Sequence, residues 1–132
     1  MSEIDKLAWL YIQNKQLLGA RSKGKNTYYI PGGKREAGES DEQALIREIK
    51  EELSVDLIPS TIKYAGTFKA QADGKPDGVM VKMTCYLAEF TGKIKEDAEI
   101  EEITWLNHHD LAKCSQVTKI IMAWLKSEGK IE

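Results

Sequence analysis

The chain has 132 residues, 42% of them hydrophobic and 30% charged, which is the composition of an ordinary globular domain. Nineteen Lys and Arg residues against twenty-one Asp and Glu residues give a formal net charge of −2, which argues against a protein that coats long nucleic acids or an anionic membrane. The longest apolar run, residues 120–125, is too short to span a bilayer.

The two cysteines, Cys85 and Cys114, are too few for a disulfide framework and lack the spacing of metal ligands. We therefore expect reduced thiols and a cytoplasmic protein. No repeat, linker or low-complexity tract divides the chain, so residues 1–132 are expected to form a single domain.

The first part of the chain predicts strands. Apolar stretches at residues 7–12 and 17–20 flank a polar segment, which is typical of a β-hairpin. Residues 27–30 have strong strand propensity, and the Pro-Gly-Gly sequence at 31–33 is expected to end that strand.

A helix is expected from about Ser40, because serine is a favourable N-cap and two acidic residues follow it. Leu45, Ile49 and Leu53 recur every four residues and form an apolar stripe. The helix is therefore predicted to bury this stripe against the rest of the domain.

Strand signals return at residues 62–68, 79–90 and 100–106, and a last helix is expected from Ser115. The polar residues 107–110 predict a turn that caps a short helical segment. The resulting order, β-β-β-α-β-β-β-α, predicts the α/β fold class and a mixed α/β sandwich.

Three glutamates on the first predicted helix carry the chemical signal. Glu48, Glu51 and Glu52 stand at i, i+3 and i+4, so their carboxylates share one face and repel each other by about 0.2–0.5 kcal/mol per pair. Mg²⁺ or Mn²⁺ binds such hard oxygen ligands and would reverse the repulsion. Alone, the pattern is more typical of a solvated helix surface, but Glu39 before the cap and Arg47 on the helix favour a site.

Residues 33–55 resemble the Nudix box, G-x5-E-x7-R-E-U-x-E-E-x-G-U, in which U is aliphatic. The matching positions are Gly33, Glu39, Arg47, Glu48, Ile49, Glu51, Glu52 and Val55. Ser54 replaces the usual glycine just past the helix end, where a left-handed residue commonly closes the last turn. A serine in that conformation costs about 1 kcal/mol, so we expect the change to affect local geometry rather than activity.

The resemblance implies a Nudix-type α/β/α sandwich with a mixed β-sheet, and a metal-dependent hydrolase. Glu48 and Glu52 would be the principal metal ligands and catalytic carboxylates, with Glu51 in support and the backbone carbonyl of Gly32 as a further ligand. Glu39 and Arg47 would be structural, joined by a carboxylate–guanidinium contact that fixes the loop beginning at Gly33 to the helix.

Hydrolysis of a pyrophosphate also needs a group that orients or deprotonates water. In this family the base is a box glutamate, here Glu48, or an acid from a later loop, and both alternatives stay open. The later candidates are Glu99, Glu101 and Glu102.

Substrate contacts are less marked in the sequence. Arg21 stands where similar proteins often place a phosphate-binding arginine, Tyr29 could flank a base, and Lys34 could add positive charge.

The resemblance implies a substrate built on a nucleoside diphosphate. We expect a (d)NTP or modified-nucleotide pyrophosphohydrolase that releases a nucleoside monophosphate, acting with Mg²⁺ as a monomer or homodimer. This preference depends on the absence, at residues 69–73, of the proline or tyrosine that ADP-ribose and dinucleoside-polyphosphate relatives carry. Alternatives are a nucleoside-diphosphate sugar or CDP-alcohol hydrolase, and a non-catalytic nucleotide-binding module.

Overall fold

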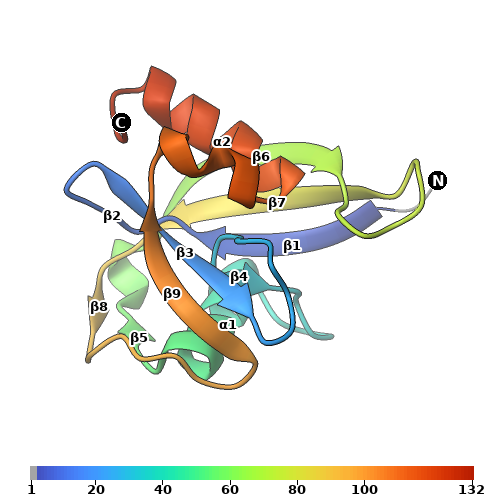
Figure 1. The fold of residues 1–132 in the computed structure, drawn as a ribbon. Helices are drawn as coiled ribbons and strands as arrows, with labels where there is room; N and C mark the ends of the chain where they lie inside the picture. Colours follow the sequence, from blue (N-terminus) through green and yellow to red (C-terminus); the bar gives the residue numbers. More distant parts are fainter. Residues whose placement is uncertain (1–2) are drawn as a thin grey trace.

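A four-stranded mixed sheet lies at the centre of the computed structural model, which describes residues 3–132 (Figure 1). Its strands, in spatial order, are β4 (Gly32–Gly33), β1 (Glu3–Trp9), β7 (Met80–Leu87) and β6 (Lys63–Gln71). β1 runs parallel to β7, and the other neighbouring pairs are antiparallel. The N-terminal strand therefore lies beside a strand more than seventy residues later in the chain.

A second sheet crosses in front of the first in Figure 1. It contains β2 (Ile12–Gln13), β3 (Gln16–Ser22) and β9 (Ile100–Leu106) in that order. A small antiparallel pair joins β5 (Asp56–Leu57) to β8 (Phe90–Thr91).

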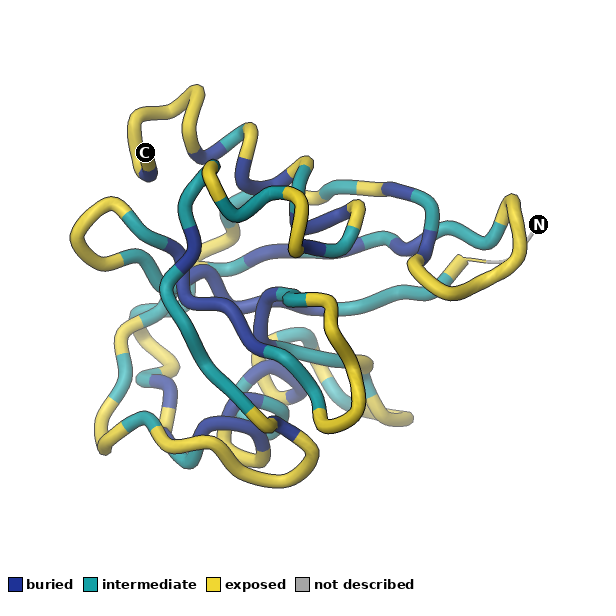
Figure 2. The backbone as a smooth tube through the Cα atoms, viewed as in Figure 1, coloured by how far each residue is buried: buried dark blue, intermediate teal, exposed yellow. Residues whose placement is uncertain are grey.

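Two α-helices cover opposite sides of the central sheet (Figure 1). The first, α1 (Asp41–Leu53), packs on β1, and the second, α2 (Gln116–Ser127), packs on β6. Each helix packs on its own cluster of buried side chains, so the interior has two apolar cores. Figure 2 shows buried backbone positions in both helices and in the strands between them. Short 3₁₀ helices occupy Pro59–Thr61 and His108–Lys113. The predicted mixed α/β sandwich is confirmed.

The ends of α1 follow from its sequence. The Ser40 side chain accepts a hydrogen bond from the backbone N–H of Gln43, whose side chain accepts one from the Ser40 N–H, and this is a complete capping box. Ser54 ends the helix at φ 64°, and its hydroxyl donates to Asp97 at 3.0 Å. The expected change in local geometry is therefore wrong, because serine keeps the left-handed conformation and gains a partner there.

The predicted hairpin is only partly correct. Its turn lies at Asn14 and Lys15, both with positive φ, but the turn joins β2 to β3. Residues 7–9 belong to β1 in the other sheet, because the chain leaves the central sheet after Trp9. The apolar run at residues 7–12 therefore contributes the end of β1 to the central sheet and the start of β2 to the second sheet.

Two expectations around residues 27–33 are wrong. Tyr28 and Tyr29 form only isolated bridges, because the Tyr28 backbone bonds to the segment before α2 while Tyr29 pairs with Ala20. The glycines expected to stop a strand instead form β4, paired with β1.

The later elements match more closely. β9 and the start of α2 coincide with the prediction, and Asn107 caps the predicted short helical segment. β6 continues to Gln71, beyond the predicted end, and the stretch at 79–90 divides into β7 and the start of β8. No helix within residues 3–132 has the length and apolar character required to cross a membrane.

Candidate active site

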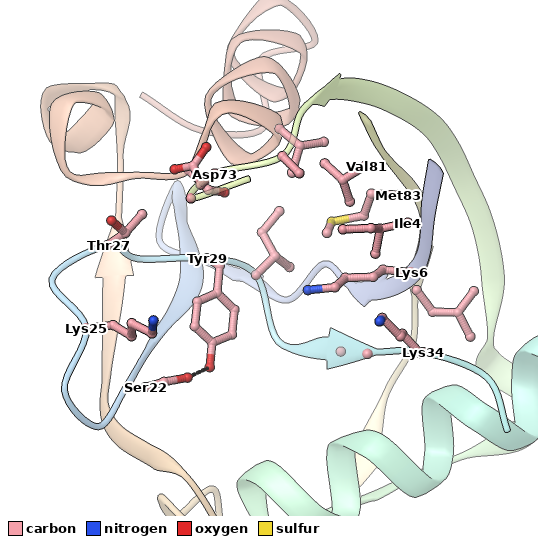
Figure 3. A pocket seen from close by; sticks show the side chains of 18 of the residues that line it. Ile4, Lys6, Ser22, Lys25, Thr27, Tyr29, Lys34, Asp73, Val81 and Met83 are labelled. Atoms are coloured by element: carbon pink, nitrogen blue, oxygen red, sulfur yellow. Dashed lines mark hydrogen bonds between the residues drawn. The ribbon is translucent and has the colours of Figure 1, made fainter. Parts of the chain in front are cut away.

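A pocket of about 710 Å³ opens between the β1–β7 face, the N-terminal end of α2 and the carboxylate face of α1 (Figure 3). Four acidic residues line the pocket: Glu48, Glu52 and Glu99 on its polar side, and Asp73 near the N-terminal end of α2. Its opposite side is apolar and includes Ile4, Ile30, Val81, Met83 and Val117. The pocket therefore joins a charged region to an apolar one large enough for part of a drug-sized ligand.

Glu52 is the most deeply placed carboxylate of the site. Its residue is only 7% exposed, and the backbone N–H of Gly32 donates to its Oε1 at 3.3 Å. Burial raises the pKa of Glu52 to about 8, and the negative charges of Glu48 and Glu99 add to this effect. The hydrogen bond from Gly32 and the positive charge of Lys6 only partly offset this rise in the pKa.

Glu48 lies one turn earlier on α1, and its carboxylate lies next to Gly33 of β4. Its Oε1 accepts a hydrogen bond from Arg47 Nη1 at 2.7 Å. A Cβ on Gly33 would overlap the Glu48 carboxylate, so a side chain at this position would displace it. Gly32 is constrained as well, because its Cβ would overlap the backbone of Leu7. The two glycines thus let β4 approach both the helix and β1.

Arg47 joins the loop before α1 to the helix itself. Its guanidinium donates to both oxygens of Glu39, at 2.7 and 2.8 Å, and to the carbonyl of Lys34 at 3.1 Å. The hydrogen bond from Arg47 lowers the pKa of Glu39 to about 2. The carboxylate–guanidinium contact expected from the sequence is present, with bidentate geometry.

Glu51 lies apart from the other two glutamates. Its side chain is 54% exposed, sits 3.4 Å from Arg47 Nη1, and does not line the pocket. The three glutamates therefore do not all face the same space, although their spacing predicts a shared face. Glu48 and Glu52 line the pocket, whereas Glu51 lies outside its lining.

The three candidates for the base from the later loop, Glu99, Glu101 and Glu102, also differ in whether they line the pocket. Glu99 lines the pocket, whereas Glu101 and Glu102 bind the guanidinium of Arg21 at 3.1 and 3.2 Å. Hydrogen bonds from Tyr28 and Arg21 also lower the pKa of Glu102. Arg21 does not line the pocket, because it pairs across strands with Glu102.

Tyr29 and Lys34, the other substrate-binding candidates, both line the pocket (Figure 3). The hydroxyls of Tyr29 and Ser22 are hydrogen-bonded at 2.5 Å, which fixes the ring over the pocket. Figure 3 shows the Lys34 side chain above β4.

Sequence reasoning missed Lys6, which lines the pocket from β1. A signal was present, because strand alternation places residue 6 on the same face as the core residue Ala8. A lysine in that row interrupts an otherwise apolar face. Lys25 and Lys75 also reach the pocket from exposed loops.

The donor set fits a divalent cation in its chemistry. Glu48, Glu52 and Glu99 offer hard carboxylate oxygens toward one space, and a cation would favour the charged form of buried Glu52. Within residues 3–132, however, no three His, Cys, Asp or Glu side chains form a preassembled metal cluster. The carboxylates would therefore adjust when an ion enters.

Comparison with known proteins gives one consistent result. The NUDIX domain family matches residues 7–125. An ADP-ribose pyrophosphatase from Methanocaldococcus jannaschii is 31% identical over 117 residues, covering 84% of this chain and 68% of that protein. A NAD-capped RNA hydrolase from Pseudomonas putida is 34% identical over 106 residues, covering 77% of this chain but only 36% of its own length. The chain thus spans about a third of that longer relative.

Solved structures agree on the fold. A MutT NUDIX hydrolase from Burkholderia pseudomallei superposes with a TM-score of 0.74 at 20% identity, covering 93% of this chain and 98% of that one. A MutT protein from Methanosarcina mazei gives a TM-score of 0.75 at 18% identity, covering 98% and 96%. At these identities the likeness concerns the fold alone.

Proposed function

This chain belongs to the Nudix family of hydrolases, enzymes that act on pyrophosphate bonds, and we propose that it uses Mg²⁺ to hydrolyse a (d)NTP or modified nucleotide to a nucleoside monophosphate. The observation that carries the proposal is a single pocket with two unlike sides. Carboxylates suited to a cation line one side, and an apolar surface suited to a base lines the other.

Glu48 and Glu52 are the residues that would hold the cation, with Glu51 and the Gly32 carbonyl in support as the motif implies. When bound, the ion would neutralise phosphate charge and act as a Lewis acid on the phosphoryl oxygens. Mn²⁺ offers the same chemistry. The hydrogen bond from Arg47 to Glu48 Oε1 would keep that carboxylate turned toward the pocket.

Glu99 is our choice for the base that accepts a proton from the attacking water. It is the one later-loop candidate among Glu99, Glu101 and Glu102 that lines the pocket. Glu48 is less suited, because one of its oxygens already accepts a hydrogen bond from Arg47. A base must lie within hydrogen-bond reach of the water, directly or through one further water.

A second substrate class has a specific observation in its favour. The ADP-ribose pyrophosphatase relative shares 31% identity across most of this chain, and ADP-ribose is a nucleoside diphosphate joined to a sugar. The alternative is therefore hydrolysis of a nucleoside-diphosphate sugar or a CDP-alcohol.

We also propose that the protein is cytoplasmic, which its two free, buried cysteines support. We propose that it acts as a monomer or homodimer.

The test is a turnover screen with Mg²⁺ or Mn²⁺ that includes (d)NTPs, oxidised nucleotides, ADP-ribose, nucleotide sugars and CDP-alcohols. Glu48→Gln and Glu52→Gln should each lower turnover about 100-fold or more, because each removes a charged oxygen donor. Glu99→Gln should lower kcat by about 100-fold with a smaller change in KM.

Glu42→Gln is the matched control, because Glu42 is exposed on the same helix and lies outside the pocket. It should retain wild-type turnover. Wild-type turnover in the Glu48→Gln and Glu52→Gln variants would refute the assignment of the carboxylates. A wild-type protein that binds nucleotides but hydrolyses none would instead be a binding module.

A further inference from the structure

Two lysines face each other across the β1–β4 pair. The register pairs Leu7 with Gly33 and Ala8 with Gly32, and continuing it by one residue places Lys6 of β1 opposite Lys34, which directly follows β4. Both residues line the pocket, and Figure 3 shows their side chains entering it from the two neighbouring strands. Two ammonium groups are therefore directed into one space.

Neither lysine has an acidic partner. In residues 3–132, no carboxylate lies within 4.0 Å of the amino group of Lys6 or Lys34, whereas Lys69 and Lys50 have ion pairs at 2.9 and 3.4 Å. Like charges at directly opposite positions on antiparallel strands destabilise the pair. An anion bound in the pocket would relieve this repulsion.

Lys6 attracts the Glu52 carboxylate and so partly offsets the rise in the pKa of Glu52 that burial causes, but in the described part of the chain neither lysine forms an ion pair with a carboxylate of the pocket. Glu48 accepts its hydrogen bond from Arg47, and Glu52 accepts one from the Gly32 N–H. Both are also the proposed cation ligands. The positive charge of the lysine pair is consequently available to a ligand.

We propose that Lys6 and Lys34 form a binding site for the terminal phosphate of a nucleoside triphosphate, so that the pair selects triphosphates over nucleoside-diphosphate sugars. A terminal phosphate carries about −1.5 to −2 charge, which matches two ammonium groups, and its three acceptor oxygens can accept hydrogen bonds from their N–H donors. An internal phosphate with an organic group on each side carries a single charge. This inference rests on the proposed function and narrows its substrate class.

The first test measures binding without turnover. Calorimetric titration with inorganic triphosphate in the presence of EDTA should show binding to the wild type, about tenfold weaker for Lys6→Met and for Lys34→Met. Lys6→Arg, which keeps the charge, should restore most of the affinity. Lys93→Met, which removes an exposed lysine outside the pocket, should bind as the wild type does. The melting temperature of Lys6→Met should not fall, because the substitution removes a like-charge contact.

The second test compares substrates. Lys6→Met should lower kcat/KM for (d)NTPs about tenfold through KM, with a change of less than about threefold for ADP-ribose. Equal losses on both substrates, or triphosphate binding equal to that of Lys93→Met, would overturn the inference while leaving the hydrolase assignment intact. If the wild type hydrolyses nothing, the proposed function fails, and the triphosphate titration still decides whether the lysine pair binds phosphate.

Discussion

Replacing Glu52 with glutamine should stabilise the metal-free protein at alkaline pH even as it removes activity. Burial raises the pKa of Glu52 to about 8 in the folded state, against about 4.5 in the unfolded chain. The folded state therefore binds the proton of Glu52 more tightly than the unfolded chain does. Ionised Glu52 consequently destabilises the folded state, and this effect is largest above about pH 8. Its destabilising effect begins as pH rises past about 4.5, grows up to about 8 and is constant beyond that.

The size of the effect follows from the shift. At about 1.4 kcal/mol for each pKa unit, ionising Glu52 in the folded state costs about 5 kcal/mol at high pH. Glutamine keeps an oxygen for the Gly32 N–H but leaves its own amide without an acceptor, which costs about 1–3 kcal/mol. We therefore expect Glu52→Gln to gain about 2–4 kcal/mol over the wild type near pH 9.

The assay is urea unfolding in EDTA at several values between about pH 5 and pH 9. The wild type and the Glu42→Gln control should both lose stability across this range, and Glu52→Gln should lose much less. Added Mg²⁺ should stabilise the wild type near pH 9 and have a smaller effect on Glu52→Gln. A variant less stable than the wild type at pH 9, or one with the same pH profile, would refute this account of the buried carboxylate.

Three further predictions concern the loop and helix around the site. Gly33→Ala should lower kcat by about 100-fold while the far-ultraviolet circular dichroism spectrum stays unchanged, because its Cβ would displace the Glu48 carboxylate; normal turnover would contradict this geometry. The pKa of Glu39 is lowered to about 2, so its contribution to stability is present above about pH 4.5 and is lost as pH falls toward 2. Glu39→Gln should therefore be less stable than the wild type near pH 7 in thermal unfolding, with the difference vanishing in acid. Ser54→Ala should lose about 1 kcal/mol in urea unfolding, because it keeps the left-handed conformation without the hydroxyl bond, whereas Ser54→Gly should lie within about 0.5 kcal/mol of the wild type.

The helix that carries the carboxylates could be predicted because its signals are local. Its cap at Ser40 and its apolar stripe, which ends at Leu53, lie within fifteen residues of sequence. The contact between Glu39 and Arg47 spans eight residues, so the helix and its preceding loop determine it.

The remainder of the site depends on which strands become neighbours. Arg21 turns from the pocket because β3 pairs with β9 and places Glu102 directly opposite it. Lys6 enters the pocket because β1 pairs with β4 on one side and with β7 on the other. A strand's own pattern predicts which faces it presents, but not its partners. The sequence could therefore mark Lys6 as a lysine on an apolar strand face, but it could not place Lys6 or Arg21 relative to the pocket.

The parallel pairing of β1 with β7 also sets an order for folding. During synthesis, α1 and its capping loop can form as soon as they emerge, because their contacts are local. β1 must wait until Met80–Leu87 has been made before its parallel partner exists, and such distant pairings fold slowly. The carboxylate helix is therefore expected to form early, and the pocket over it late. Until β7 is in place, the nascent chain leaves the backbone groups along one edge of β1 unpaired, which makes this the interval in which it is most prone to aggregation.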